Sequence, residues 1–176
     1  MKTEERINRL GLVIPTLAEP VASYINYRRS GNLLFLSGVG PTKEGKVQYA
    51  GKVGREVSLE DAYQAARLCA LNHLAQIKSA VGEFDSIAQV VFLQGFINCA
   101  PGFTDSPAVL NGASDLLIAV FEDRGRHSRA AVGVAELWKN IPVETVLTVE
   151  LYGYRIEESA NLRLPRKYSR HGNGDL

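Results

Sequence analysis

Two side chains near the C-terminal end of the sequence could do chemistry on a small carboxylic acid. Arg129 opens a run of small and β-branched residues that is typical of a strand. A guanidinium at a strand end can hold a carboxylate through two parallel hydrogen bonds. Glu144 enters the next apolar run, where partial burial would raise its pKa toward a range useful for proton transfer. The pair predicts carboxylate binding and proton transfer, with a surface ion pair left open for Arg129 and a solvent-facing position for Glu144.

Motifs for other kinds of chemistry are missing from the sequence. It contains no phosphate-binding loop, no dinucleotide fingerprint and no Gly-x-Ser-x-Gly elbow. His73, His127 and His171 fall in three different kinds of segment, and neither Cys69 nor Cys99 has a second ligand at metal spacing. We therefore expect no metal site, and free thiols in a reducing compartment, the cytoplasm. For His73, on the apolar stripe of a helix, we expect a structural role with a backbone carbonyl as partner.

Size and charge narrow the classes of protein further. The 176 residues fit one domain, and the net charge of +1 gives no sign of the basic face that nucleic-acid binders carry. No apolar run is long enough to span a bilayer, and the N-terminus lacks a signal-peptide pattern. We predict a lead-in over residues 1–19, a domain over 20–156 and a solvated tail over 157–176. For the lead-in, the pattern leaves a helical turn and an edge strand open.

Periodicity predicts two helices among several strands. One helix is expected from Ser58, a plausible cap, to Val81, and another from Ser106-Pro107 to about Gly125. Strands are expected over 20–28, 33–36 and 87–98 and in the two runs that carry Arg129 and Glu144, with a Gly-Asn turn at 31–32 and a loose hairpin over 42–54. This order predicts an α+β fold with two helices on one face of a mixed sheet. Since the other face would need a cover, we expect symmetric self-association with a ligand site between subunits.

Together these segments resemble the RidA/YjgF family of reactive-intermediate imine deaminases, over about residues 21–153. The matching stretches are residues 31–38 (Gly-Asn-Leu-Leu-Phe-Leu-Ser-Gly), Asn111, residues 129–137 (Arg-Ala-Ala-Val-Gly-Val-Ala-Glu-Leu) and Glu144, fifteen positions after Arg129. Tyr24 also falls where the family carries a site tyrosine. Trp138 replaces a usual proline and Ala131 a small polar or thiol residue, which indicates a divergent branch.

The resemblance implies a chorismate-mutase-like fold that assembles as a homotrimer with clefts between subunits. It also implies hydrolysis of 2-imino and 2-enamino acids to 2-keto acids and ammonia, without metal or organic cofactor. Arg129 and Glu144 would be the catalytic residues, and Arg129, Tyr24, Ser37, Gly38 and Asn111 would bind the substrate. Two alternatives stay open: a regulatory trimer that binds small carboxylates without turnover, and a ribonuclease or translation inhibitor, which the near-neutral charge disfavours.

The spacing of the two catalytic candidates carries a geometric expectation. If the two last strands form a hairpin centred near Lys139, Glu144 pairs near Val134 and is offset from Arg129 by five residues. That offset is roughly 17 Å along a strand. We therefore expect that the two side chains do not meet within one subunit and that each site takes one group from each neighbour.

Overall fold

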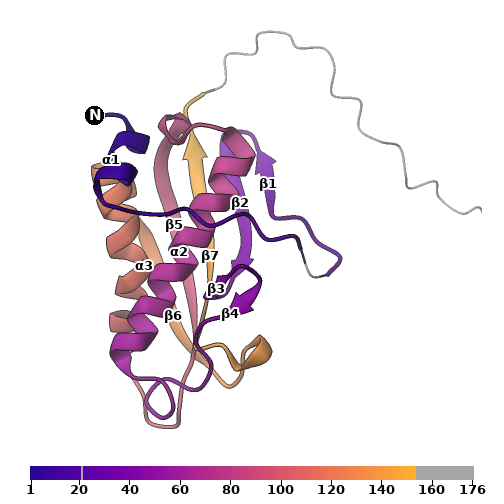
Figure 1. The fold of residues 1–176 in the computed structure, drawn as a ribbon, viewed down its shortest axis with the longest axis vertical. Helices are drawn as coiled ribbons and strands as arrows, with labels where there is room; N and C mark the ends of the chain where they lie inside the picture. The colour runs from indigo at the N-terminus through magenta and orange to yellow at the C-terminus, as the bar shows by residue number, and fades with distance from the viewer. Residues whose placement is uncertain (21, 154–176) are drawn as a thin grey trace, which may run out of the picture.

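A five-stranded mixed sheet with two long helices on one face forms the protein (Figure 1). The computed structural model describes residues 1–20 and 22–153. In chain order the elements are α1 (Thr3–Arg9), β1 (Tyr27–Ser30), β2 (Leu33–Val39), β3 (Thr42–Lys43), β4 (Lys46–Val47), α2 (Leu59–Val81), η1 (Phe84–Ser86), β5 (Ile87–Asn98), α3 (Ser106–Phe121), η2 (Glu122–Gly125), β6 (Ser128–Val134), η3 (Trp138–Asn140) and β7 (Val143–Leu151).

The strands follow the order β1-β2-β7-β5-β6 across the sheet. Strand β5 runs parallel to β6, and every other neighbouring pair in this sheet is antiparallel. The predicted α+β plan, a mixed sheet with two helices on one face, is confirmed. The hairpin expected between the two last strands is wrong, because β5 lies between β6 and β7. The first strand is also shorter than expected and begins only at Tyr27.

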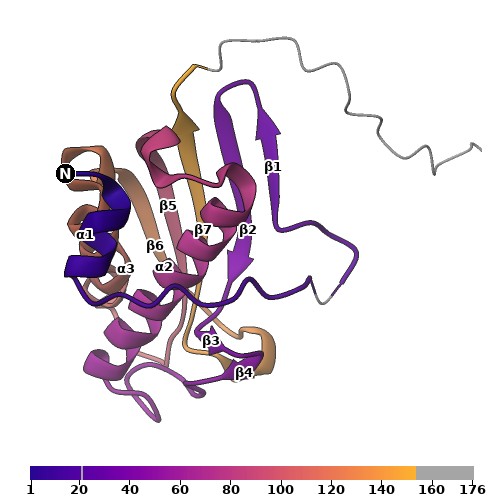
Figure 2. The ribbon, with the colours of Figure 1, turned by 45° about the horizontal axis from the view of Figure 1, so that its top comes forward.

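The two long helices begin and end close to the predicted positions. The hydroxyl of Ser58 accepts the backbone N–H of Asp61 at 3.0 Å, which caps α2, and Gly82 ends this helix with a φ of 74°. Helices α2 and α3 lie side by side in both views (Figures 1 and 2). They approach so closely that a Cβ at Gly112 would lie 1.9 Å from the carbonyl oxygen of Tyr63. Only glycine fits at this crossing.

Burial alternates strictly along β7 and shows which face each residue occupies. Val143, Thr145 and the following odd-numbered residues are buried under the helices, whereas Glu144 and the following even-numbered ones are half-buried on the other face. Within the described residues no helix covers that second face, and it includes Phe35 and Val132, which are 45% and 41% exposed. This open face is the surface for which self-association was predicted.

The N-terminal lead-in forms helix α1 and an extended segment behind it. Ile7 is buried, and the Arg6 guanidinium donates a hydrogen bond to the Val120 carbonyl at 2.8 Å, which ties α1 to the end of α3. The chain then crosses in front of α2 toward β1 (Figure 2). The predicted tail over 157–176 lies outside the described residues. Among the described helices, none is both long and apolar enough to cross a membrane.

Candidate functional site

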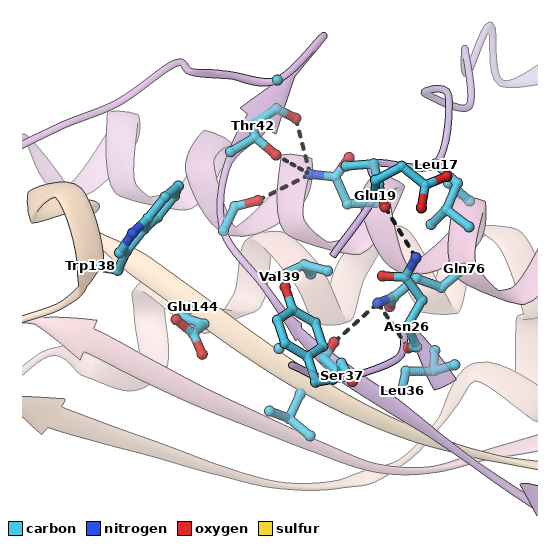
Figure 3. A pocket seen from close by; sticks show the side chains of 18 of the residues that line it. Leu17, Glu19, Asn26, Leu36, Ser37, Val39, Thr42, Gln76, Trp138 and Glu144 are labelled. Carbon is cyan, nitrogen blue, oxygen red and sulfur yellow. Dashed lines mark hydrogen bonds between the residues drawn. The ribbon is translucent and has the colours of Figure 1, made fainter. Parts of the chain in front are cut away.

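A cavity of about 550 Å³ opens between the N-terminal segment, strand β2 and the helical turn η3 (Figure 3). Its lining includes residues 16–19, residues 36–40 at the end of β2, Asn72 and Gln76 of α2, Trp138, and Glu144 of β7. Tyr24 also lines it. The lining contains two carboxylates, Glu19 and Glu144, but no lysine or arginine. An anionic ligand in this cavity would therefore need a cation from elsewhere.

The carboxylate of Glu144 lies against strand β2 where that strand has no side chain. A Cβ on Gly38 would come within 2.5 Å of the Glu144 Oε1 atom. Within the described residues the carboxylate makes no hydrogen bond or ion pair, and burial raises its pKa. A half-buried carboxyl group without a partner is suited to exchange protons with a ligand or a water molecule.

The wall beside Glu144 is fixed by hydrogen bonds to the backbone. The Ser37 hydroxyl donates to the Ile25 carbonyl at 2.6 Å, and the Ser37 N–H donates to the Asn26 carbonyl at 2.9 Å. From α2, the Gln76 amide donates to the carbonyls of Asn26 and Ser37 at 3.1 and 3.2 Å. The hydrogen of the Ser37 hydroxyl is thus used in a structural bond, and its oxygen can still accept a hydrogen bond from a ligand.

Behind this wall a buried histidine links helix α2 to strand β7. His73 Nδ1 lies 2.8 Å from Gln76 Oε1, and its Nε2 lies 3.0 Å from the Thr145 hydroxyl. Because Gln76 Oε1 can only accept, Nδ1 carries the proton of the neutral ring. Burial lowers the pKa of His73 to about 4. His73 is therefore structural, as predicted, although its partners are side chains and not a backbone carbonyl.

Arg129 and Asn111 line a second, shallower pocket at the edge strand β6. The Arg129 guanidinium donates from Nη1 to the Ser114 hydroxyl at 2.9 Å and from Nη2 to the Pro107 carbonyl at 3.3 Å. Within the described residues it has no carboxylate partner. Asp115, in the same pocket, accepts instead from the Tyr63 hydroxyl at 2.9 Å. Arg129 is a tethered, half-buried cation with unused N–H groups.

The two catalytic candidates occupy opposite faces of the sheet. Glu144 is level with Phe96 of β5 and, through it, with Val132 of β6 on the open face. Arg129 is level with the buried Leu93 and points to the helix face. Within one subunit the two side chains lie in separate pockets, as expected. They are separated because they point to opposite faces of the sheet, not because of the five-residue offset of a hairpin.

The predicted site residues thus fall into two groups. Tyr24, Ser37, Gly38 and Glu144 line the large cavity, and Arg129 and Asn111 line the shallow pocket. Sequence reasoning missed several side chains at these places: Asn72, Gln76 and Trp138 at the cavity, and Ser114 and His127 at the pocket. For Gln76 a signal existed, since it follows His73 by three positions on the buried stripe of a helix. No cluster of three or more metal-ligating side chains occurs among the described residues.

This chain is similar to known proteins both in sequence and in fold. The model of a family described as "YjgF/chorismate_mutase-like, putative endoribonuclease" matches residues 4–153. Protein TCP17 of Trypanosoma cruzi is 40% identical over 146 residues, which are 82% of this chain and 91% of that protein. The crystal structure of Atu1372 from Agrobacterium tumefaciens, described as a protein of unknown function, is 43% identical with a TM-score of 0.79, covering 85% of this chain and 92% of the other. RidA from the Antarctic bacterium Psychrobacter sp. PAMC 21119 shares the fold alone, at 22% identity and a TM-score of 0.55 over 79% of this chain and 96% of its own.

Proposed function

Because this chain belongs to the YjgF/chorismate-mutase-like family, we propose that it hydrolyses reactive 2-imino and 2-enamino acids to 2-keto acids and ammonia, in clefts between the subunits of a homotrimer. One observation supports this most: among the described residues, the cavity is lined by carboxylates but by no lysine or arginine, and Arg129 at the sheet edge has no carboxylate partner. Within the described part of the chain the cavity therefore lacks a cation, which Arg129 could supply, and Arg129 lacks a carboxylate partner. An interface that brings the edge strand of one subunit to the open face of the next would join them.

The proposed reaction assigns one task to each half of the cleft. Arg129 of one subunit binds the carboxylate of the imino acid, an interaction of about 1.5–3 kcal/mol. The imine carbon then lies beside Glu144 of the neighbouring subunit, with Tyr24 and the backbone at Gly38 around it. Ionised Glu144 accepts a proton from a water molecule as the water oxygen attacks the imine carbon, and passes this proton to the nitrogen to give a carbinolamine. It then relays the hydroxyl proton of the carbinolamine to the nitrogen as the C–N bond breaks, which releases the 2-keto acid and ammonia.

This reaction consumes water and releases a 2-keto acid and ammonia, so the proposal includes no metal or organic cofactor. The raised pKa of Glu144 favours acceptance of the proton from water, since the carboxylate of a weaker acid is the better base. We also propose that the protein acts in the cytoplasm, where its two free thiols, Cys69 and Cys99, would persist.

The activity is tested by following ammonia and keto-acid release from 2-iminopropanoate generated in situ. We expect wild type to accelerate release, and Arg129→Ala and Glu144→Gln each to abolish most of the acceleration. If wild type binds the 2-keto acid but gives no acceleration, the protein is a carboxylate-binding trimer. Salt-sensitive RNA cleavage that survives repurification would instead support the endoribonuclease description of the family.

The composite cleft is tested by mixing the two inactive variants. Refolding or co-expressing Arg129→Ala with Glu144→Gln at equal amounts creates some clefts with Arg129 from one chain and Glu144 from the other. Random assembly into a ring predicts recovery of about a quarter of wild-type activity. No recovery, in assemblies shown by mass spectrometry to contain both chains, would contradict a site shared between subunits.

A further inference from the structure

Three side chains that line the shallow pocket form one continuous line of hydrogen bonds. Arg129 Nη1 donates to Ser114 Oγ at 2.9 Å, and Ser114 Oγ lies 3.0 Å from His127 Nε2. His127 Nδ1 lies 2.6 Å from the Gly125 carbonyl oxygen. The line joins strand β6 to helix α3 and to the turn η2, and Ser114 is 7% exposed.

The positions of the protons along this line follow from its two ends. The Gly125 carbonyl can only accept, so the proton of the neutral His127 ring is on Nδ1 and Nε2 is an acceptor. The Arg129 guanidinium can only donate, so the Ser114 oxygen accepts from it and the Ser114 hydroxyl donates to Nε2. Each of the three hydrogen bonds in this line then has one donor and one acceptor. Burial, and secondarily the charge of Arg129, lower the pKa of His127, which favours the neutral ring of this pattern, although a protonated Nε2 could also donate to the Ser114 oxygen without breaking its bond to Arg129.

We propose that Ser114 and His127 are positioning residues, which hold the Arg129 guanidinium so that its free N–H groups meet the carboxylate of the ligand. This inference rests on the proposed function, because it refines the carboxylate-binding half of the cleft. Among the described residues, Ser114 and Pro107 accept from two of the five guanidinium N–H groups, which leaves three for a ligand. Without Ser114 the long side chain of Arg129 can adopt other rotamers. Fixing it in one rotamer then costs free energy when the ligand binds.

The line also couples ligand binding to the charge of His127. A bound carboxylate offsets the positive charge of Arg129, so it raises the pKa of the neighbouring His127. By reciprocity, protonation of His127 tightens ligand binding by the same factor. The other charged groups of this pocket are already engaged: Asp115 with the Tyr63 hydroxyl, and Arg126 with Asp123 at 3.2 Å.

The experiment measures binding without turnover, using the stable ligand 2-oxobutanoate. Calorimetric titration of wild type, Ser114→Ala and His127→Gln gives the dissociation constants. We expect Ser114→Ala to weaken binding roughly 5- to 10-fold. We expect a smaller loss in His127→Gln, whose amide oxygen can still accept from Ser114. The matched control is Ser128→Ala, which removes a hydroxyl next to Arg129 in sequence that donates to the Val91 carbonyl at 2.9 Å and is not part of the line.

A second readout separates positioning from a merely structural effect. The ring resonances of His127, assigned by their loss in His127→Gln, are titrated by NMR with and without 2-oxobutanoate. We expect the ligand to raise the pKa of His127 and to leave His73, which contacts Gln76 and Thr145 instead, unchanged. Ring titration isolates His127 from Glu144, whose own protonation would also alter the overall affinity.

The outcomes distinguish this inference from the proposed function. If wild type does not bind 2-oxobutanoate, the positioning role and the proposed function are both contradicted. If wild type binds through Arg129 but Ser114→Ala binds equally well, or the pKa of His127 does not respond to the ligand, the positioning role is overturned and the proposed function stands. Weakening by Ser128→Ala to the same degree would also overturn it.

Discussion

Replacing Gly38 by alanine should lower the activity of this protein but leave its stability nearly unchanged. Gly38 lies in strand β2 with a backbone φ that other residues adopt, so the substitution causes no backbone strain. Its added Cβ would lie 2.5 Å from Glu144 Oε1 and 3.3 Å from the Glu144 Cδ atom. The carboxylate is the free end of a flexible side chain. It can move away cheaply, but it then leaves its present position.

The size of the effect follows from that displacement. Oε1 must move by about 0.9 Å to reach the 3.4 Å of an ordinary contact. A misplacement of about 1 Å in a catalytic group typically costs up to 100-fold, so we expect kcat/KM to fall roughly 10- to 100-fold, or about 1.4–2.7 kcal/mol of transition-state stabilisation. The free energy of unfolding should change by less than about 1 kcal/mol, since alanine restricts the unfolded chain and offsets the small strain.

A double-mutant cycle shows whether this loss acts through Glu144. Imine hydrolysis and urea denaturation are measured for Gly38→Ala, Glu144→Gln and the double variant. We expect Gly38→Ala to have almost no further effect in the Glu144→Gln background, because the displaced group is already inactive. Equal losses in both backgrounds would show that Gly38 acts through another contact. Full activity of Gly38→Ala would refute the assignment of Glu144 as the proton-transfer group.

Three further predictions concern the framework of the site. Gly112→Ala must push α2 and α3 apart at Tyr63, so urea denaturation should show a loss of roughly 3 kcal/mol or more. His73 has a folded-state pKa of about 4, below its ordinary 6.5, so the unfolded chain binds the extra proton. Stability is then complete above pH 6.5 and falls by up to about 3 kcal/mol toward pH 4, and denaturation at several pH values should show a flatter profile for His73→Gln. Asn98→Ala removes bonds from Lys52 at 2.8 Å and to Asn140 at 2.9 Å, which should cost about 2 kcal/mol in the same assay.

The regular elements were predictable because their signals are local. The apolar stripe from Ser58 to Val81, with a cap at one end and glycine beyond the other, predicted the bounds of helix α2 to within about one residue. The β-rich run over Ile87–Asn98 gave β5. Strand pairing is not local. The run that follows Arg129 and the run that contains Glu144 are adjacent in sequence, and a hairpin is the simplest connection, yet the earlier strand β5 lies between them.

The partners of the site residues were harder to predict than the residues themselves. Arg129 and Glu144 stand out as charged residues in strand-like runs. Nothing local shows that Ser114, on a helix, accepts a hydrogen bond from Arg129, since that contact spans helix α3 and strand β6. The link of Gln76 to the backbone at Ser37 likewise joins segments 39 positions apart. Such contacts depend on how the layers pack, which periodicity does not specify.

The placement of Arg129 and Glu144 on opposite faces of the sheet has a chemical consequence for the proposed reaction. If both pointed into one pocket of one subunit, they would form an ion pair. The pair would lower the pKa of Glu144, whereas burial in the cavity raises it. It would also occupy the guanidinium N–H groups that a ligand carboxylate needs. With the two groups on separate faces, neither has a charged partner among the described residues. In the proposed assembly a neighbouring subunit would complete the site, and the ligand would place its own carboxylate and imine between the two groups. An isolated subunit should then be inactive with both residues intact, so activity at falling protein concentration should disappear together with the assembled form.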